Sequence, residues 1–223
     1  MKKLMPISNF KKTELITTDG ELKIKYLSGY PRSYRFDASR GLFNENGENT
    51  LTKKGQPFSF APIAYRKFRD NILGFGMKTW IEFFFLNESL QVCALMFHGY
   101  SVDEFMRTAN AMFYDDVSPC DCLITATPNE KTSNNPEAKG QKYFIAQFSY
   151  KPLPKEDATK IEQATESLQI WRQDTTTGDA KIQLFQNWKP PHVSDNLSAD
   201  KANKQLSENP RAENELLQTA AGA

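Results

Sequence analysis

The chain contains few of the residues on which exported proteins and metalloenzymes depend. Its 223 residues include 3 Cys and 2 His. No run of about 18 consecutive apolar residues is present, so we expect no membrane-spanning helix. The opening residues MKKLMP lack the apolar segment of a signal peptide. An odd number of cysteines without an export signal indicates free thiols in a reducing compartment. We therefore expect a cytoplasmic protein that makes no contact with a membrane.

Catalytic signatures are also missing from the chain. Residues 74–79 (GFGMKT) depart from a phosphate-binding loop, because Met77 separates the second glycine from the lysine. Asp115 and Asp116 follow a predicted helix. A solvated loop explains this acidic pair better than a cation site, since hard-cation sites usually gather more oxygen ligands. We therefore expect no enzyme activity and no cofactor.

The few sulfur and imidazole groups leave one metal site as an alternative. Cys93, His98, Cys120 and Cys122 could together hold zinc, but Cys120 and Cys122 are closer in sequence than the ligand pairs of structural zinc sites. Cys93 lies in the most apolar part of the chain, where a buried free thiol is common. We expect these thiols to be structural, and zinc stays the alternative.

Aromatic residues and an uneven charge are what the chain does contain. Aromatics make up 12% of the residues, and the formal net charge is +1. Residues 1–86 carry 15 Lys and Arg against 8 Asp and Glu, whereas residues 87–223 carry 13 against 19. Such a split is a hint of nucleic-acid contact with a separate acidic region. It is equally expected of two halves that attract each other within one fold.

Hydrophobic periodicity predicts a mainly β fold. Residues 79–86 (TWIEFFFL) and 90–97 (LQVCALMF) are the most apolar segments, and the short polar loop between them predicts a central antiparallel hairpin. Residues 57–65 predict another strand, which Pro62 interrupts and thereby places at a sheet edge. Alternation or apolar content predicts further strands at 21–27, 32–36, 121–127 and 142–150.

One amphipathic helix is predicted after Gly99. Apolar residues recur at helical spacing from Val102 to Tyr114. Ser101 and Glu104 have the spacing of a capping box, in which each side chain binds the backbone amide of the other residue. The polar stretch 128–141 predicts a loop that is too long for a tight hairpin.

The residues after 152 change in composition. A second helix is predicted within 154–173 and a last strand at 181–188. Residues 193–223 contain no aromatic residue and too little apolar surface to offset an ordering cost of about 1–2 kcal/mol per residue. We therefore predict a domain at 1–152, a helix-plus-strand appendage at 153–192 and a flexible tail at 193–223 that is available to protein partners.

The order of these elements resembles that of OB-fold single-stranded DNA-binding proteins. The strands would be 21–27, 79–86, 90–97, 121–127 and 142–150, with the helix between the third and the fourth. This resemblance covers residues 20–152 and implies an α+β fold: an OB-like Greek-key barrel, elaborated at 28–78. It also implies that the loop 128–141 holds single-stranded nucleic acid.

Clusters of aromatic and cationic residues are consistent with the nucleic-acid binding that the resemblance implies. Single strands bind in cationic grooves that also carry rings on which bases stack. Alternation along 32–36 would place Arg32, Tyr34 and Phe36 on one face and Ser33 and Arg35 on the other. The nucleic-acid-binding residues that we predict are Tyr30, Arg32, Tyr34, Arg35, Phe36, Arg40, Lys53, Lys54, Tyr65, Arg66, Lys67, Arg69, Lys131 and Lys139, with Lys142 beside the long loop.

Two functions stay open on the sequence alone. The first is a non-enzymatic, non-sequence-specific single-stranded DNA-binding protein that acts in replication or recombination, of a phage or a mobile element. The second is a structural or assembly protein, including a homo-oligomer, whose aromatic surface makes protein contacts. The two differ in where the rings lie, because a ring on a strand is more often part of a core than a base-stacking platform.

Overall fold

The structure is a computed structural model that describes residues 23–74, 76–134, 136 and 139–191. Within these residues the fold is mainly β, as predicted. The strands are β1 (Arg32–Asp37), β2 (Leu42–Glu45), β3 (Asn49–Thr50), β4 (Phe58–Phe60), β5 (Pro62–Asp70), β6 (Lys78–Leu86), β7 (Val92–His98), β8 (Cys122–Thr132), β9 (Lys142–Pro152) and β10 (Lys181–Gln186). The helices are α1 (Tyr100–Tyr114) and α2 (Lys155–Thr165), with 3-10 turns η2 (Ile72–Gly74), η3 (Pro119–Asp121) and η5 (Gln173–Thr175).

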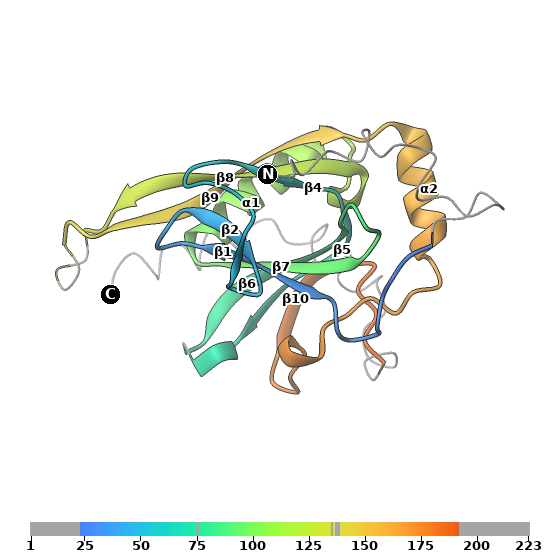
Figure 1. Ribbon diagram of the computed structural model, residues 1–223, viewed down its shortest axis with the longest axis horizontal. Coiled ribbons are helices and arrows are strands. Elements are labelled where there is room, and N and C mark those ends of the chain that lie inside the picture. Colours follow the sequence, from blue (N-terminus) through green and yellow to red (C-terminus); the bar gives the residue numbers. More distant parts are fainter. Residues whose placement is uncertain (1–22, 75, 135, 137–138, 192–223) are drawn as a thin grey trace.

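The strands form two sheets. The larger sheet has the order β10-β5-β6-β7-β1-β2-β3, in which β1 and β7 are parallel and the other neighbours are antiparallel (Figure 1). The smaller sheet has the order β4-β8-β9. Both sheets are open within the described residues, so the expected OB-like Greek-key barrel is not confirmed.

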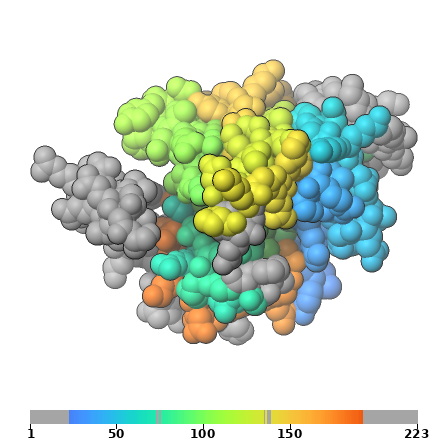
Figure 2. Space-filling view, turned by 90° about the vertical axis from the view of Figure 1, so that its left-hand side faces the viewer, coloured from blue at the N-terminus to red at the C-terminus, as the bar shows by residue number. Residues whose placement is uncertain are grey.

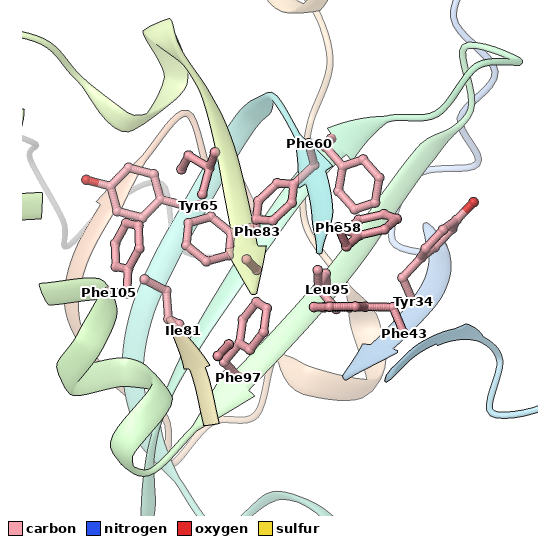
Figure 3. Close-up of a cluster of buried hydrophobic side chains, with 14 of the residues drawn as sticks. Tyr34, Phe43, Phe58, Phe60, Tyr65, Ile81, Phe83, Leu95, Phe97 and Phe105 are labelled. Atoms are coloured by element: carbon pink, nitrogen blue, oxygen red, sulfur yellow. The ribbon is translucent and has the colours of Figure 1, made fainter. Parts of the chain in front are cut away.

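The central hairpin is confirmed, and its rings build the main core. β6 and β7 lie between β5 and β1, and apolar groups cover both faces of the pair. On one face, Phe83 packs edge-to-face on Phe105 of α1, with the ring centroids 4.8 Å apart (Figure 3). Residues from α2 to Trp188 cover the opposite face. A strand that is buried on both faces needs a nearly continuous apolar sequence, which explains the composition of 79–86.

The strand predicted at 57–65 is in fact two strands in different sheets. β4 pairs with β8 in the smaller sheet, and after Ala61 the chain enters β5 of the larger sheet. Pro62 is the first residue of β5, the position where a missing amide hydrogen disturbs a ladder least. The edge placement was wrong for β5, because β10 pairs with its outer side.

The helix after Gly99 is confirmed, but the capping box is wrong. Gly99 is the N-cap residue, with a φ of 58°, and no side chain caps the helix. The Ser101 hydroxyl instead accepts a hydrogen bond from the Ala146 amide (3.0 Å). This contact fixes the first turn of α1 to β9, so the serine acts between elements rather than within the helix.

The predicted strand at 21–27 is also wrong as far as it is described. Of residues 23–27, Lys25 makes an isolated bridge to Gln91, and no regular strand forms. β8 and β9 are instead longer than expected, because their ladder runs from Cys122 opposite Pro152 to Thr132 opposite Lys142. The predicted loop 128–141 thus shortens to 133–141, and the paired strands project from the rest of the molecule (Figure 1).

The second helix and the last strand are present as α2 and β10, and β10 joins the larger sheet beside β5. The tail predicted at 193–223 lies outside the described residues. In the part of the chain that is described, no helix is long and apolar enough to cross a membrane.

Candidate nucleic-acid interface

The projecting end of the β8–β9 hairpin meets two loops from the N-terminal half. The Phe144 amide donates a hydrogen bond to the Ala38 carbonyl (2.7 Å), and the Gly55 amide donates one to the Gly41 carbonyl (2.8 Å). Gly41 has a φ of 66°, and a Cβ atom there would lie 2.5 Å from Cδ1 of Phe144. Glycine is therefore required at 41 for the loops to reach the hairpin.

This contact gathers cations that are far apart in sequence. Glu130 pairs with Lys142 (2.5 Å) and Lys54 (3.5 Å), and the Lys54 ammonium lies 5.1 Å from the centroid of the Phe144 ring. The side chains of Lys54 and Lys142 are 65% and 67% exposed. The hydrogen bond from Lys142 contributes most to lowering the pKa of Glu130, so this carboxylate is ionised at neutral pH.

The hairpin surface, as we name it, consists of exposed cations on the hairpin and the adjoining loops. Figure 2 shows the hairpin (yellow) beside the N-terminal segments (blue and cyan). Its members are Arg40, Lys53, Lys54, Lys131, Lys139 and Lys142. The structure thus places five of the predicted residues on the hairpin and its adjoining loops, with Lys142 added; Lys131 lies on the face of the hairpin opposite to Lys142.

Arg40 is the member of this surface that has its own acid. It pairs with Asp37 at 2.6 Å and stays 57% exposed. Burial acts to raise the pKa of Asp37, but hydrogen bonds from Ser39 and Arg40 outweigh it and lower that pKa to about 2. The pair is therefore charged at any ordinary pH.

Tyr143 is a ring on the other face of the hairpin. Side chains alternate along each strand, so Tyr143 and Lys131 project from the face opposite to Glu130, Lys142 and Phe144. Tyr143 lies opposite Lys131 in the β8–β9 ladder and is half-buried. Opposite residues in an antiparallel ladder project from the same face, so the ring and the ammonium group are neighbours. Sequence reasoning missed Tyr143, because the pairing register that places it beside Lys131 depends on the unexpected length of both strands.

The rings of the N-terminal stretch do not form the expected platform. Tyr34 is 6% exposed and packs on Phe58 and Phe85, and desolvation raises its pKa to about 12. Phe36 packs on Phe43 and Phe97. The predicted alternation holds, in that Tyr34 and Phe36 share one face, but this face is the core. The buried Tyr34 ring therefore cannot stack on bases, and the half-buried Phe36 ring is packed against the core.

The other members of that stretch are exposed but separate. Arg32 pairs with Glu45 and donates a hydrogen bond to Gln91 (2.6 Å). Arg35 is exposed on the opposite face of β1, and Tyr30 is 59% exposed before β1 begins. Their cations and ring are accessible, yet no contact joins them to the hairpin surface within the described residues.

Arg66 and Tyr65 are also core residues rather than binding residues. Arg66 is fully buried, pairs with Glu82 (2.7 Å) and lies between the rings of Phe68 and Trp188, at 4.0 and 4.6 Å. Tyr65 is 6% exposed, and burial raises its pKa above the ordinary range. Arg66 thus packs inside the protein against one ring that is near it in the sequence, Phe68, and one that is distant, Trp188.

Lys67 and Arg69 lie at a different place, on the face of β5 that is opposite to Arg66. Lys67 lines a cleft of about 560 Å³ beside the start of α1. His98 also lines this cleft and packs on Trp80, with the ring centroids 4.9 Å apart. Desolvation, followed by the charge of Lys78, lowers the pKa of His98. The imidazole is therefore neutral at pH 7.

The thiols show no sign of activation. Burial raises the pKa of Cys93 to about 12, that of Cys122 to about 11 and that of Cys120 further still. A protonated thiol is a poor nucleophile and a poor ligand. In the described part of the chain no three groups among His, Cys, Asp and Glu are placed to hold a metal ion, which gives the zinc alternative no support.

Comparison of the chain with protein-family models, curated proteins and solved structures finds no match. The relationship to OB-fold proteins stays a prediction, and the function is argued from the surface geometry.

Proposed function

We propose that this protein binds single-stranded nucleic acid, without sequence preference, through the hairpin surface. The observation that carries the proposal is the meeting of two exposed cations, Lys54 from a loop and Lys142 from the projecting hairpin, at one carboxylate, Glu130. Cationic surfaces follow a phosphate backbone without reading bases, so the expected binding is non-specific.

The ion pairs of this surface do not oppose the proposal. Exposed pairs of this kind contribute about 0–1 kcal/mol. A phosphate can therefore displace Glu130 from Lys54 and Lys142 at little cost, and it brings its own charge-assisted hydrogen bonds.

A single strand suits the surface better than a duplex. Tyr143 lies beside Lys131 on one face of the hairpin, and the Phe144 ring lies under the Lys54 ammonium on the other face. Bases of a flexible strand can reach a half-buried ring such as Tyr143, whereas paired bases are stacked and inaccessible. Competition by duplex DNA should therefore be weaker than competition by unlabelled single strands.

The test is a salt series with a fluorescent oligo(dT) of about 16 nucleotides, followed by anisotropy. If all six cations contact phosphates, log K should fall with log salt with a slope of about −4 between about 50 and 200 mM NaCl. Lys54→Ala/Lys142→Ala should weaken binding and reduce the steepness of the slope by about 1.4, since each single-strand contact contributes about 0.7.

The matched control is Lys155→Ala/Lys160→Ala on α2. Lys160 is also exposed and also pairs with a glutamate, Glu156, so this variant removes the same charge from a different part of the surface. It should bind as the wild type does. No binding of the wild type at about 50 mM salt would overturn the proposal.

One observation favours the second function. Phe113 and Tyr114, at the end of α1, are 75% and 83% exposed and pack on each other with ring centroids 5.6 Å apart. Exposed rings of this size are typical of protein contacts. Under this alternative, sedimentation should show a defined oligomer that Phe113→Ser/Tyr114→Ser dissociates, and the oligo(dT) should not bind.

A further inference from the structure

The cleft beside the start of α1 is separate from the hairpin surface in its residues. Its volume is about 560 Å³, and its lining comes from β5, β6, β7, α1 and β10. In Figure 2, the segment that leads into β6 (green-blue) lies on the same face of the molecule as the hairpin (yellow). A strand that leaves the hairpin surface across this face can therefore reach the cleft.

The lining of the cleft is polar and has an excess of positive charge. The lining includes two lysines, Lys67 and Lys78, and one acid, Asp103, and Asp70 lies opposite Lys78 in the β5–β6 ladder. Thr79, His98 and Gln183 add groups that can donate hydrogen bonds. Val102 is 2% exposed and is the apolar member of the lining. This combination of two ammonium groups with neutral donors suits a phosphate group.

A ring is available next to the cleft. Tyr100 follows Gly99, which lines the cleft, and Tyr100 is 66% exposed. Tyr100 also lies three residues before Asp103 on α1, so the two side chains are neighbours on the surface of the helix. Base stacking on a ring contributes about 1–3 kcal/mol, so a phosphate in the cleft could have its base on Tyr100.

We propose that the cleft binds the phosphate of a nucleotide, held by Lys67 and Lys78, with the base against Tyr100. The phosphate could belong to a bound strand or to a free mononucleotide, and the first source rests on the function proposed above. The two sources have the same chemistry in the cleft, so the experiment must separate them.

The test follows the ring-proton signals of His98 by NMR. The chain has 2 His, so a His98→Gln variant assigns the signal by its loss. Separate titrations use inorganic phosphate, dTMP and the oligo(dT). We expect dTMP or the oligo(dT) to move the His98 signal, and Lys67→Gln/Lys78→Gln to abolish that movement. The same variant should weaken oligo(dT) binding and reduce the steepness of its salt slope by about 1.4.

A variant that is expected to bind more tightly is also included, because a loss of binding can result from misfolding whereas a gain cannot. Asp103→Asn removes the acid of the cleft and should tighten the binding that moves His98 by several-fold. The Lys155→Ala/Lys160→Ala control should leave the movement unchanged. Movement with the oligo(dT) alone identifies a strand as the source, and movement with dTMP identifies a free nucleotide.

Failure of this inference differs from failure of the proposed function. If the oligo(dT) binds by anisotropy but none of the three probes moves His98, the cleft inference is wrong and the hairpin surface stands. If dTMP moves His98 and the oligo(dT) does not bind, the cleft holds free nucleotides and the single-strand function is wrong. Movement that persists in Lys67→Gln/Lys78→Gln would also overturn the cleft inference.

Discussion

Arg66 and Lys54 carry the same formal charge next to aromatic rings, in opposite surroundings. Arg66 is fully buried and forms an ion pair with Glu82, whereas Lys54 lies in a surface loop and its side chain is 65% exposed. Each cation pairs with a carboxylate from a strand, Glu82 for Arg66 and Glu130 for Lys54. What separates the two cations is burial, because a buried cation needs its paired charge whereas an exposed one is solvated.

The Arg66–Glu82 pair makes a prediction about stability. Arg66→Met should lower the free energy of unfolding by about 3 kcal/mol, because the buried Glu82 charge then keeps only the more distant Arg172, at 3.9 Å, as a cationic neighbour. Urea denaturation measures this change. Arg66→Met/Glu82→Met should recover most of the loss, since the pair is then replaced by apolar groups. A single variant as stable as the wild type would contradict the buried pairing.

Glu130 makes a prediction about affinity. Glu130→Gln removes the carboxylate that competes with phosphate for Lys54 and Lys142, so oligo(dT) should bind several-fold more tightly at low salt. The control is Glu156→Gln, which frees Lys160 on α2 in the same way. Weaker binding by Glu130→Gln would mean that the carboxylate positions the lysines rather than competing for them.

Among the elements, the central hairpin and the helix after Gly99 could be predicted because their signals are local. The apolar content of 79–86 and the spacing from Val102 to Tyr114 are visible within one segment. The extension of β8 and β9 could not, since residues 128–132 are polar and pair as strand by continuing a register set in the core. The hairpin surface depends on that extension. Its lysines and arginine could therefore be identified in the sequence, but their proximity in the fold could not be predicted.

The turn at Gly41 tests how the loops are attached to the hairpin. Gly55→Ala should cost about 1–2 kcal/mol of stability, because its φ of 75° strains an L-residue while its Cβ meets no described atom within 4 Å. Gly41→Ala has the same backbone strain and also a contact with the Phe144 ring, which adds about 1–3 kcal/mol. Chemical denaturation of the two variants measures the difference, and equal losses would contradict the close approach.

At the scale of the whole molecule, the residues after 152 complete the larger sheet. β10 pairs with β5, and Ile161, Ile170 and Trp188 are buried against the face opposite the main core. The sequence indicated a helix and a strand in this region, but composition does not say against which strand a distant segment packs. The sequence of β5 would be the same whether or not another strand pairs with its outer side, so the pairing with β10 could not be predicted from it.

Truncation tests this arrangement. A chain that ends at residue 152 should lose its cooperative thermal unfolding, because an apolar face of the larger sheet is left uncovered. A chain that ends at residue 191 keeps all the described elements and should unfold cooperatively. Circular dichroism distinguishes the two. A cooperative transition of the shorter chain near that of the longer one would show that residues 1–152 fold alone.

The β8–β9 ladder also determines how the length of the projecting hairpin can be changed. Side chains alternate with a period of two along each strand, so adding residues in pairs to both strands beyond Thr132 and Lys142 lengthens the hairpin and leaves Phe144 facing the core. A single residue added to β9 between Lys142 and Phe144 would turn Lys142 to the other side. If the hairpin surface binds a strand as proposed, insertions of two residues per strand should lengthen the surface that a strand can follow without any change to the packed interior.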